Sequence, residues 1–169
     1  MAAGTITTLA SVARGSSARG RQPYLVEQSI DIAAAVAAKG SALEAGEIIQ
    51  AITVPDNTMI LTAGVEITTA MDASSADAVL SLGVTGGDVD RFVAAFEFDA
   101  ADAPAGTYAT MADGTAPVII GSTADTIDLE LDSITTAPVT GVLRCFAVLL
   151  DVDGLGAMTA DEVDRDVLA

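Results

Sequence analysis

The sequence predicts an all-β protein, an antiparallel β-sandwich of jelly-roll-like form with an extended N-terminal arm and one or two short helices. Small residues are abundant and aromatic residues make up only 4% of the 169-residue chain, which suits thin sheets packed by small side chains. A chain of this length can bury one core without disulfides or metals. The main observation is an alternation of apolar and polar residues, the period of a half-buried strand, over residues 24–32, 47–70, 78–84, 126–132 and 140–152.

Composition divides the chain into three parts. Residues 1–22 are mainly Ala, Gly, Ser and Thr, and such a segment cannot bury enough apolar surface to fold alone. We interpret it as a basic arm, which is either a disordered terminus or an anchor. Residues 23–152 form the predicted sandwich body, and residues 153–169 form an acidic C-terminal segment that we expect to be a short helix.

Charge is distributed unevenly along the chain. The formal net charge is −17, yet the arm contains Arg14, Arg19 and Arg21 and no acidic residue, so all 24 acids lie after it. We expect the body to repel nucleic acid and anionic membranes, and the arm to bind an acidic surface. The chain has no apolar run of about 18 residues, and its start lacks the apolar core of a secretory signal, so we expect it to fold in a cytosol.

The first predicted strand covers residues 23–32 and has one solvent-facing side. The alanine-rich run 33–38 is ambiguous, because alanine favours a helix but the run is short, and a loop is expected over 39–46. The solvent-facing side of the strand is formed by Leu25, Glu27, Ser29 and Asp31.

The most regular stretch, residues 47–71, predicts a β-hairpin. Its turn consists of Pro55, Asp56, Asn57 and Thr58, in which proline presets φ and the Asp and Asn side chains can bond their own backbone. The residues expected on the inner face are Ile48, Ile52 and Val54 before the turn, and Met59, Leu61, Ala63, Val65 and Ile67 after it.

Residues 78–84 predict a further strand, with Leu80, Leu82 and Val84 facing inward. Asp88 is then expected to cap a short helix. The apolar residues that fall at helical spacing behind this cap are Val89, Phe92, Val93 and Phe96.

A long surface loop is expected over residues 99–114, pinned by Tyr108, and short strands over 117–120 and 126–132. In the last of these strands the apolar residues face the core and the acids form an outer row, which would also oppose edge-to-edge association. That outer row consists of Asp128, Glu130 and Asp132.

The stretch 140–152 is unusual because both of its faces are apolar. A strand of a two-sheet sandwich has only one face in its own core, so a loop or a neighbouring subunit has to cover the other. One face presents Leu143, Cys145, Ala147 and Leu149. The other presents Val142, Arg144, Phe146, Val148 and Leu150, which we take as the candidate oligomer interface.

No catalytic motif is evident, and we do not expect an enzyme or a cofactor. The single cysteine, Cys145, lies in an apolar strand and is expected to be a small core residue. The chain contains no histidine, which excludes Cys-His and Ser-His-Asp arrangements and any zinc site that uses histidine.

The sharpest motif match is the stretch 151–162, DVDGLGAMTADE, set against a calcium-binding EF-hand loop. Asp151, Asp153 and Glu162 stand at ligand positions one, three and twelve, but Leu155 occupies position five and offers no side-chain oxygen. We therefore expect no metal, and interpret the stretch as a strand end, a glycine turn and a capping box that starts the C-terminal helix. A calcium site at these three acids is the alternative.

Four stretches in order, PYLVEQSIDI, AAKGSALEAGEIIQAITVPDNTMILTAGVEI, LSLGVTGGDVDRFV and DTIDLELDSITTAPVTGVLRCFAVLLDV, resemble capsid decoration or cement proteins of tailed bacteriophages, in particular those of marine phages and cyanophages. The resemblance covers roughly residues 23–152. It implies a virion protein on the capsid exterior, made in the host cytoplasm, that binds the major capsid protein as a homotrimer and stabilises the shell.

Two other classes share parts of this pattern. A tail-fibre, knob or other host-recognition virion protein would have the same acidic all-β body, but its loops would carry an aromatic or ligand-binding cluster, which residues 99–114 lack. A secreted calcium-binding adhesion module would need an export signal and an occupied site at Asp151.

Overall fold

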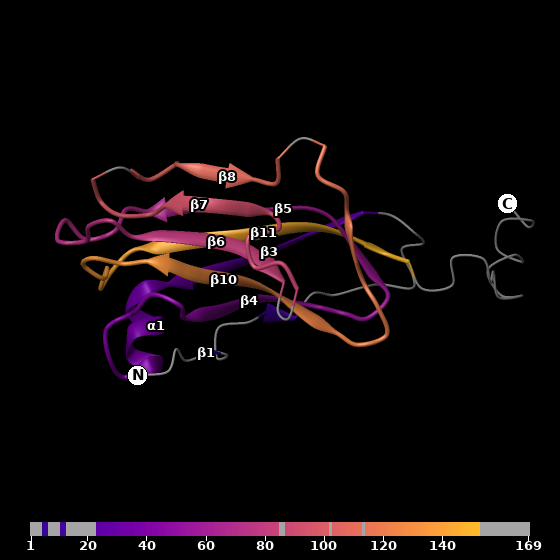
Figure 1. Cartoon of the computed structure of the whole chain (residues 1–169), viewed down its shortest axis with the longest axis horizontal. Helices are drawn as coiled ribbons and strands as arrows, with labels where there is room; N and C mark the ends of the chain where they lie inside the picture. Colours follow the sequence, from indigo (N-terminus) through magenta and orange to yellow (C-terminus); the bar gives the residue numbers. More distant parts are fainter. Residues whose placement is uncertain are drawn as a thin grey trace, which may run out of the picture.

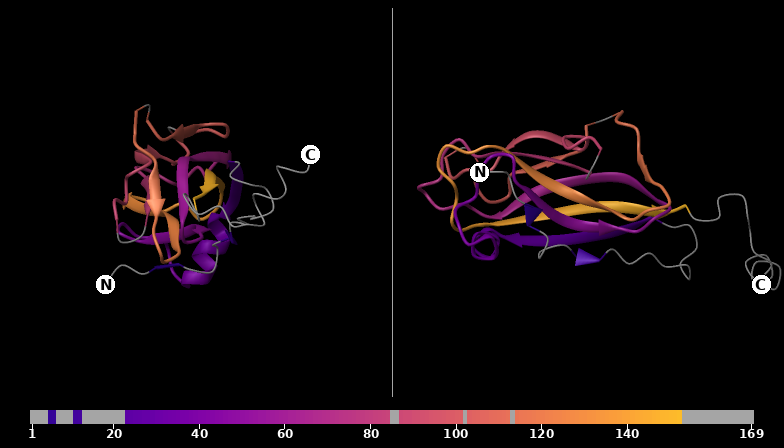
Figure 2. Two further views of the ribbon diagram at one scale, coloured as in Figure 1. Left: turned by 90° about the vertical axis from the view of Figure 1, so that its right-hand side faces the viewer. Right: turned by 60° about the horizontal axis from the view of Figure 1, so that its bottom comes forward.

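The computed structural model describes residues 5–6, 11–12, 23–84, 87–101, 103–112 and 114–152. It is a β-sandwich of two sheets with one short helix in the described part, which confirms the predicted all-β sandwich (Figures 1 and 2). No helix within the described ranges is long and apolar enough to cross a membrane.

The first sheet, sheet A, has the strand order β1-β4-β10-β6-β7, with β2 also paired to β4. The pairs β4–β10, β10–β6 and β6–β7 are antiparallel, whereas β1 and β2 run parallel to β4. Its strands are β1 (Thr5–Ile6), β2 (Ser11–Val12), β4 (Ile48–Val54), β6 (Val79–Val84), β7 (Val93–Glu97) and β10 (Asp125–Ser133).

The second sheet, sheet B, has the order β3-β11-β5-β8, with β9 also paired to β5, and all its pairs are antiparallel. Strand β11 lies at its centre, where it pairs with β5 along its whole length and, on the other side, with β3 from Val142 to Leu149. The strands are β3 (Tyr24–Asp31), β5 (Thr58–Thr69), β8 (Tyr108–Thr110), β9 (Val118–Ile120) and β11 (Val142–Asp151).

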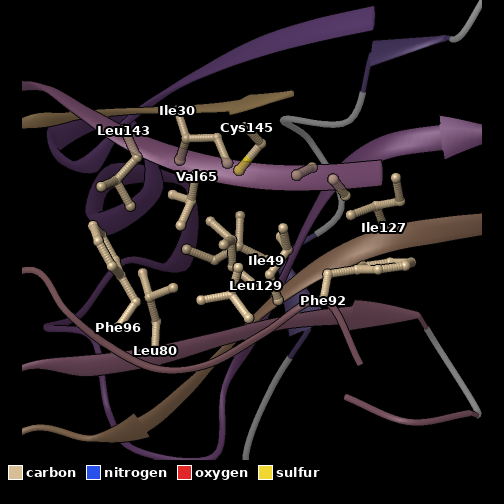
Figure 3. Packing of buried hydrophobic residues seen from close by; sticks show 14 of the residues in the cluster. Ile30, Ile49, Val65, Leu80, Phe92, Phe96, Ile127, Leu129, Leu143 and Cys145 are labelled. Atoms are coloured by element: carbon tan, nitrogen blue, oxygen red, sulfur yellow. The ribbon is translucent and has the colours of Figure 1, made fainter. Parts of the chain in front are cut away.

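The core lies between the sheets and consists mainly of aliphatic side chains, with a few phenylalanines filling gaps (Figure 3). Inward positions of β6 and β10 follow the predicted alternation. The largest completely buried side chains are those of Phe98, Ile30, Ile32, Ile49, Ile52, Ile60, Ile67, Leu80, Leu82, Ile127, Leu129 and Leu131.

The ambiguous alanine-rich run forms helix α1 (Ile32–Lys39), which closes one end of the sandwich. Asp31 caps its first turn by accepting a hydrogen bond from the backbone N–H of Ala33 at 2.8 Å. Gly40 ends it in the left-handed conformation, at φ 79°, which a side chain would disfavour. Lys39 then pairs at 2.5 Å with the buried carboxylate of Glu47, and this ion pair closes the loop that leads into β4.

The predicted hairpin over residues 47–71 is wrong. Its two strands exist as β4 and β5, but they belong to different sheets, so the turn between them crosses the sandwich. The turn is held by partners in other segments: the N–H of Asn57 donates to the Gly121 carbonyl and its carbonyl accepts from Val152, both at 2.8 Å. Alternation has a period of two in either arrangement, so the pattern could not distinguish a hairpin from a crossing between sheets.

The inner faces of these two strands also differ from the prediction, because each contains a β-bulge. Residues Ile49 and Ala51 are buried whereas Ile48 is half-buried, and in β5 the buried residue is Ile60 between half-buried Met59 and Leu61. Register shifts occur in the β4–β10 and β5–β11 pairs, each where one strand carries an extra residue. A single extra residue reverses the alternation on one side of it.

The helix predicted behind Asp88 is wrong as well, since that region contains strand β7 paired to β6. Phe96 pairs with Leu80 and Val93 with Leu82, with a register shift between them. Ala95 has a positive φ of 54°, and the resulting bulge puts two residues three positions apart on the same inner face. The bulge thus reproduces helical spacing in a strand.

Residues 99–114 are not a continuous loop, because they include β8, and Tyr108 anchors the segment through backbone pairing while its side chain is 69% exposed. The acidic outer row of β10 also needs correction, since Asp128 is buried. Gly83 lies directly opposite it, and a Cβ at Gly83 would lie 2.2 Å from the Asp88 carbonyl. The turn at Asp88 therefore folds over the outer face of sheet A beside Asp128 and shields it.

A network around Asp72 joins the loop after β5 to the loop before β11. Its carboxylate accepts hydrogen bonds from the backbone N–H groups of Val139 at 2.7 Å and Thr140 at 3.1 Å, and from the hydroxyl of Ser74. These bonds, the Ser74 hydroxyl first, lower the pKa of Asp72 from 3.8 to about 2. The folded structure therefore stabilises the ionised form of the Asp72 carboxylate.

Candidate interaction surface

Strand β11 has one fully buried and one partly exposed face, as the sequence predicted. The inner face, from Leu143 to Leu149, has zero exposure. The five candidate interface residues all lie on the outer face of sheet B, where they are half-buried: Val142, Arg144, Phe146, Val148 and Leu150. Because β11 is the central strand, this face has neighbours on both sides.

The pairing register extends the apolar part of this face across four strands. Leu150 lies opposite Met59 of β5, which lies opposite Ile119 of β9, and Val148 lies opposite Leu25 of β3. Leu25 and Ile119 are 59% and 60% exposed, unusually high for large aliphatic side chains. We name these five residues the apolar end of sheet B; such contiguous exposed apolar surface is typical of a protein contact.

Phe146 occupies the middle of the same face. It lies directly opposite Gly64 of β5, and a Cβ placed on Gly64 would lie 2.5 Å from the tip of its ring. The tip of the ring therefore lies over the backbone of Gly64, and the carbonyl of Ala109 in β8 is equally close to the place where a side chain would begin. The glycine makes room for an aromatic platform between the apolar end and the charged residues beyond it.

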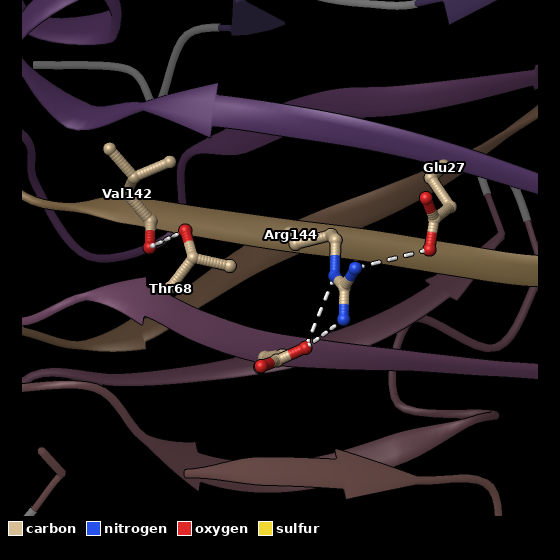
Figure 4. Close-up of polar contacts among 5 residues, drawn as sticks. Glu27, Thr68, Val142 and Arg144 are labelled. Atoms are coloured by element: carbon tan, nitrogen blue, oxygen red, sulfur yellow. Dashed lines mark hydrogen bonds and ion pairs between the residues drawn. The ribbon is translucent and has the colours of Figure 1, made fainter. Parts of the chain in front are cut away.

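Arg144 links the three longest strands of the face (Figure 4). Its Nη1 lies 3.3 Å from Glu27 Oε1 on β3, and its Nε donates to Glu66 Oε2 on β5 at 3.1 Å, with a second contact from Nη2 to the same oxygen. The hydrogen bond with Glu66 raises the pKa of Arg144 above the already high usual value of an arginine. Two carboxylates share one guanidinium, so this cluster keeps a net negative charge beside the apolar end.

The outer face of sheet A has a different character. Its four long strands contain no lysine or arginine in their sequences. Outward positions carry acids instead, among them Glu97, Glu130 and Asp132. The sandwich therefore has an acidic outer face and, on the other side, an apolar face with one charged cluster, which suits solvent on the first and protein on the second.

The remaining sequence candidates give no second site. Burial raises the pKa of the Cys145 thiol to about 12, which leaves it protonated and unsuited to nucleophilic chemistry. Within the described ranges no group of three metal-ligating side chains occurs. Asp151 is the last residue of β11, whereas Asp153 and Glu162 lie outside the described residues, as do the three arm arginines Arg14, Arg19 and Arg21.

Sequence reasoning missed the partners that complete this surface. Met59 was expected in the core, and Glu66 and Ile119 were not connected to β11. The one residue in the sequence that indicated this surface was Leu25, a large apolar residue on the side of β3 that was predicted to face solvent, and the structure leaves it exposed there. Strand pairing alone brings the other residues next to it.

Comparison with known proteins supports the fold only. No family model matches the chain, and no curated protein matches it. Solved structures with a similar fold include a chain of the capsid asymmetric unit of cyanophage Pam1, at 13% identity and a TM-score of 0.57, covering 82% of this chain and 91% of that one. A chain of the Ralstonia phage GP4 capsid is similar at 12% identity and a TM-score of 0.58, covering 87% and 97%.

Proposed function

We propose that the chain is a virion structural protein of a tailed bacteriophage, a capsid decoration or cement protein that binds the outer capsid lattice as an oligomer and stabilises the shell. The observation that carries this proposal is the outer face of sheet B, an apolar and aromatic surface on a sandwich that is otherwise acidic. A binding surface without catalytic groups fits a structural role.

The similar folds support a capsid context. They extend over 91% and 97% of the matched chains, so the likeness covers a whole component of each phage capsid structure and not a domain of a larger one. In this proposal the protein is made in the host cytoplasm, its partners are the major capsid protein and further copies of itself, and it is no enzyme.

The two outer faces suggest an orientation. Sheet B would contact neighbouring copies in a homotrimer or the major capsid protein, because burying Leu25 and Ile119 removes apolar surface from water. Sheet A would face the solvent on the capsid exterior, where its acids keep the particle soluble. The basic arm with Arg14, Arg19 and Arg21 would supply the positive charge that an acidic body needs to approach an acidic shell.

Replacement of Leu25 by Asp tests the surface. Its side chain is already 59% exposed, so we expect the single chain to stay folded, whereas an interface would have to bury an unpaired carboxylate. We expect a loss of about 3 kcal/mol of association free energy, more than a hundredfold in the dissociation constant. Sedimentation measures the oligomer, and cryo-electron microscopy of capsids incubated with the protein measures occupancy.

The matched control is Ala94→Asp, which adds the same charge to an exposed position on β7 of sheet A. We expect this variant to associate and to occupy capsids like the wild type. Equal loss in both variants would mean that added charge alone is responsible, and full association of Leu25→Asp would refute the role of this surface. A wild-type chain that sediments as a stable monomer would refute the oligomer.

A further inference from the structure

The outer edge of β4 is the least completed part of sheet A. On its inner side β4 pairs with β10 along nearly its whole length. On its outer side the described pairing consists of two pieces only, each two residues long: Thr5–Ile6 beside Ile48 and Ile49, and Ser11–Val12 beside Ile52 and Thr53. The sequence of β4, IIQAITV, strongly favours a β-strand, yet only part of its outer edge is paired, and the partners are two short parallel segments of the arm.

A strand edge of this composition is an acceptor for another strand. Its residues are mostly β-branched, and neither Lys, Pro nor an acid interrupts it. Extended segments bind such edges through backbone hydrogen bonds, with little demand on sequence. Because each arm piece makes only a few of these bonds, its hold on the edge is weak and reversible.

The segment between Val12 and Tyr24, which connects the arm to the body, can reach much farther than is needed for the arm to pair with β4 of its own chain. Val12 lies beside Thr53, near the end of β4. Tyr24, at the start of β3, lies level with Ile60 near the start of β5, with strand β11 between them. Both points are therefore at the end of the sandwich where β4 turns into β5, and β3 packs against β4. The residues between Val12 and Tyr24 can span about 40 Å, several times the ~10 Å between packed sheets.

Charge favours the same contact on any copy of the body. The arm carries its arginines without an acid, whereas β10, the strand next to β4, carries the solvent-accessible acids Asp125, Glu130 and Asp132. A neighbouring body presents the same edge and the same acids. Exchange of an identical element between copies preserves every contact, so it costs little once the copies are held side by side.

We propose that the outer edge of β4 is an acceptor site for the N-terminal segment of a second copy, so that Thr5–Ile6 and Ser11–Val12 of one chain complete sheet A of its neighbour. This exchange rests on the self-association proposed above, but it does not require a capsid. It links copies through sheet A, in addition to the contacts made by the outer face of sheet B.

Cross-linking of two singly substituted chains tests the exchange. One full-length chain carries Val12→Cys and the other Thr53→Cys, positions that are neighbours across the pair. After mixing and treatment with a short bis-maleimide, we expect covalent dimers containing one chain of each kind. An excess of a synthetic peptide of residues 1–22 should reduce them, because it competes for the same edge. The control pair, Val12→Cys with Glu97→Cys on the opposite edge of sheet A, should yield about tenfold less, since only paired strands lie ~4.8 Å apart.

Sedimentation of the same samples separates this inference from the proposed function. An oligomer that gives the expected dimers supports both self-association and exchange. An oligomer whose two substituted pairs cross-link equally, or not at all, overturns arm exchange and leaves the oligomer intact. A monomer without cross-linked dimers overturns exchange together with the proposed oligomer.

Discussion

Replacement of Gly64 by Ala should destabilise the fold, because the position has no room for a methyl group. An ideal Cβ there would lie 2.5 and 2.9 Å from two atoms of the Phe146 ring and 2.6 Å from the Ala109 carbonyl. Carbon atoms in contact are normally about 3.5 to 4.0 Å apart, so the overlap is about 1 Å. The ring can swing outward, but the carbonyl belongs to the paired strand β8 and can move only if that pairing loosens.

We expect Gly64→Ala to lower the free energy of unfolding by about 2 to 3 kcal/mol, the range of an overpacked interior site. For a chain of this size that corresponds to a fall in Tm of about 5 to 10 °C. Urea unfolding followed by circular dichroism, at a fixed chain concentration, measures the change. The control is Gly121→Ala, where no atom lies within 4 Å of the added methyl and φ is not positive; this variant should be neutral or slightly stabilised.

A double-mutant cycle with Phe146→Ala identifies the source of the clash. If the ring carries most of it, removing the ring should recover about 1 kcal/mol or more of the Gly64→Ala loss. A coupling near zero would assign the clash to the Ala109 carbonyl. An unfolding curve of Gly64→Ala that matches the wild type would refute the placement of Phe146 over β5, and with it the aromatic platform of the proposed interface.

Three further predictions follow from single groups. Because the pKa of Asp72 is lowered from 3.8 to about 2 in the folded state, the stabilisation by its carboxylate is complete above about pH 5 and is lost as the pH falls through 2; the stability difference between wild type and Asp72→Asn, only about 1 kcal/mol at neutral pH because solvent screens this mostly exposed group, should shrink over that window in acid-dependent urea unfolding. The thiol of Cys145, buried and with a pKa of about 12, should react with a disulfide reagent only as fast as the protein unfolds, and rapid labelling of the folded protein would contradict its place in the core. Changing the three arm arginines to serine should weaken capsid occupancy most at low salt, because each exposed pair contributes only about 0.2 to 1 kcal/mol; full occupancy at every salt concentration would make the arm a bystander.

The candidate surface could be predicted only in part. Alternation along β11 identified both of its faces, because a strand with two apolar faces needs a cover on each. Leu25 was visible as an apolar residue on a wet face. The partners of these residues could not be read from the sequence: Ile119 joins the apolar end through Met59, and Glu27 and Glu66 meet at Arg144, only because three separate strands pair in one register.

The sequence by itself determined that this is a β-sandwich with a buried cysteine and a strongly acidic body, since alternation, composition and charge are local properties that survive any rearrangement of the strands. Tertiary structure decided which strands pair. Residues 47–71 alternate equally well as a hairpin or as two strands in different sheets, and the bulge at Ala95 makes a strand look helical. Tertiary structure also decided that Asp128 of β10 is buried, because the turn at Asp88 that covers it connects two other strands, β6 and β7. Pairing depends on contacts between distant segments, and a pattern with a period of two contains no information about the partner.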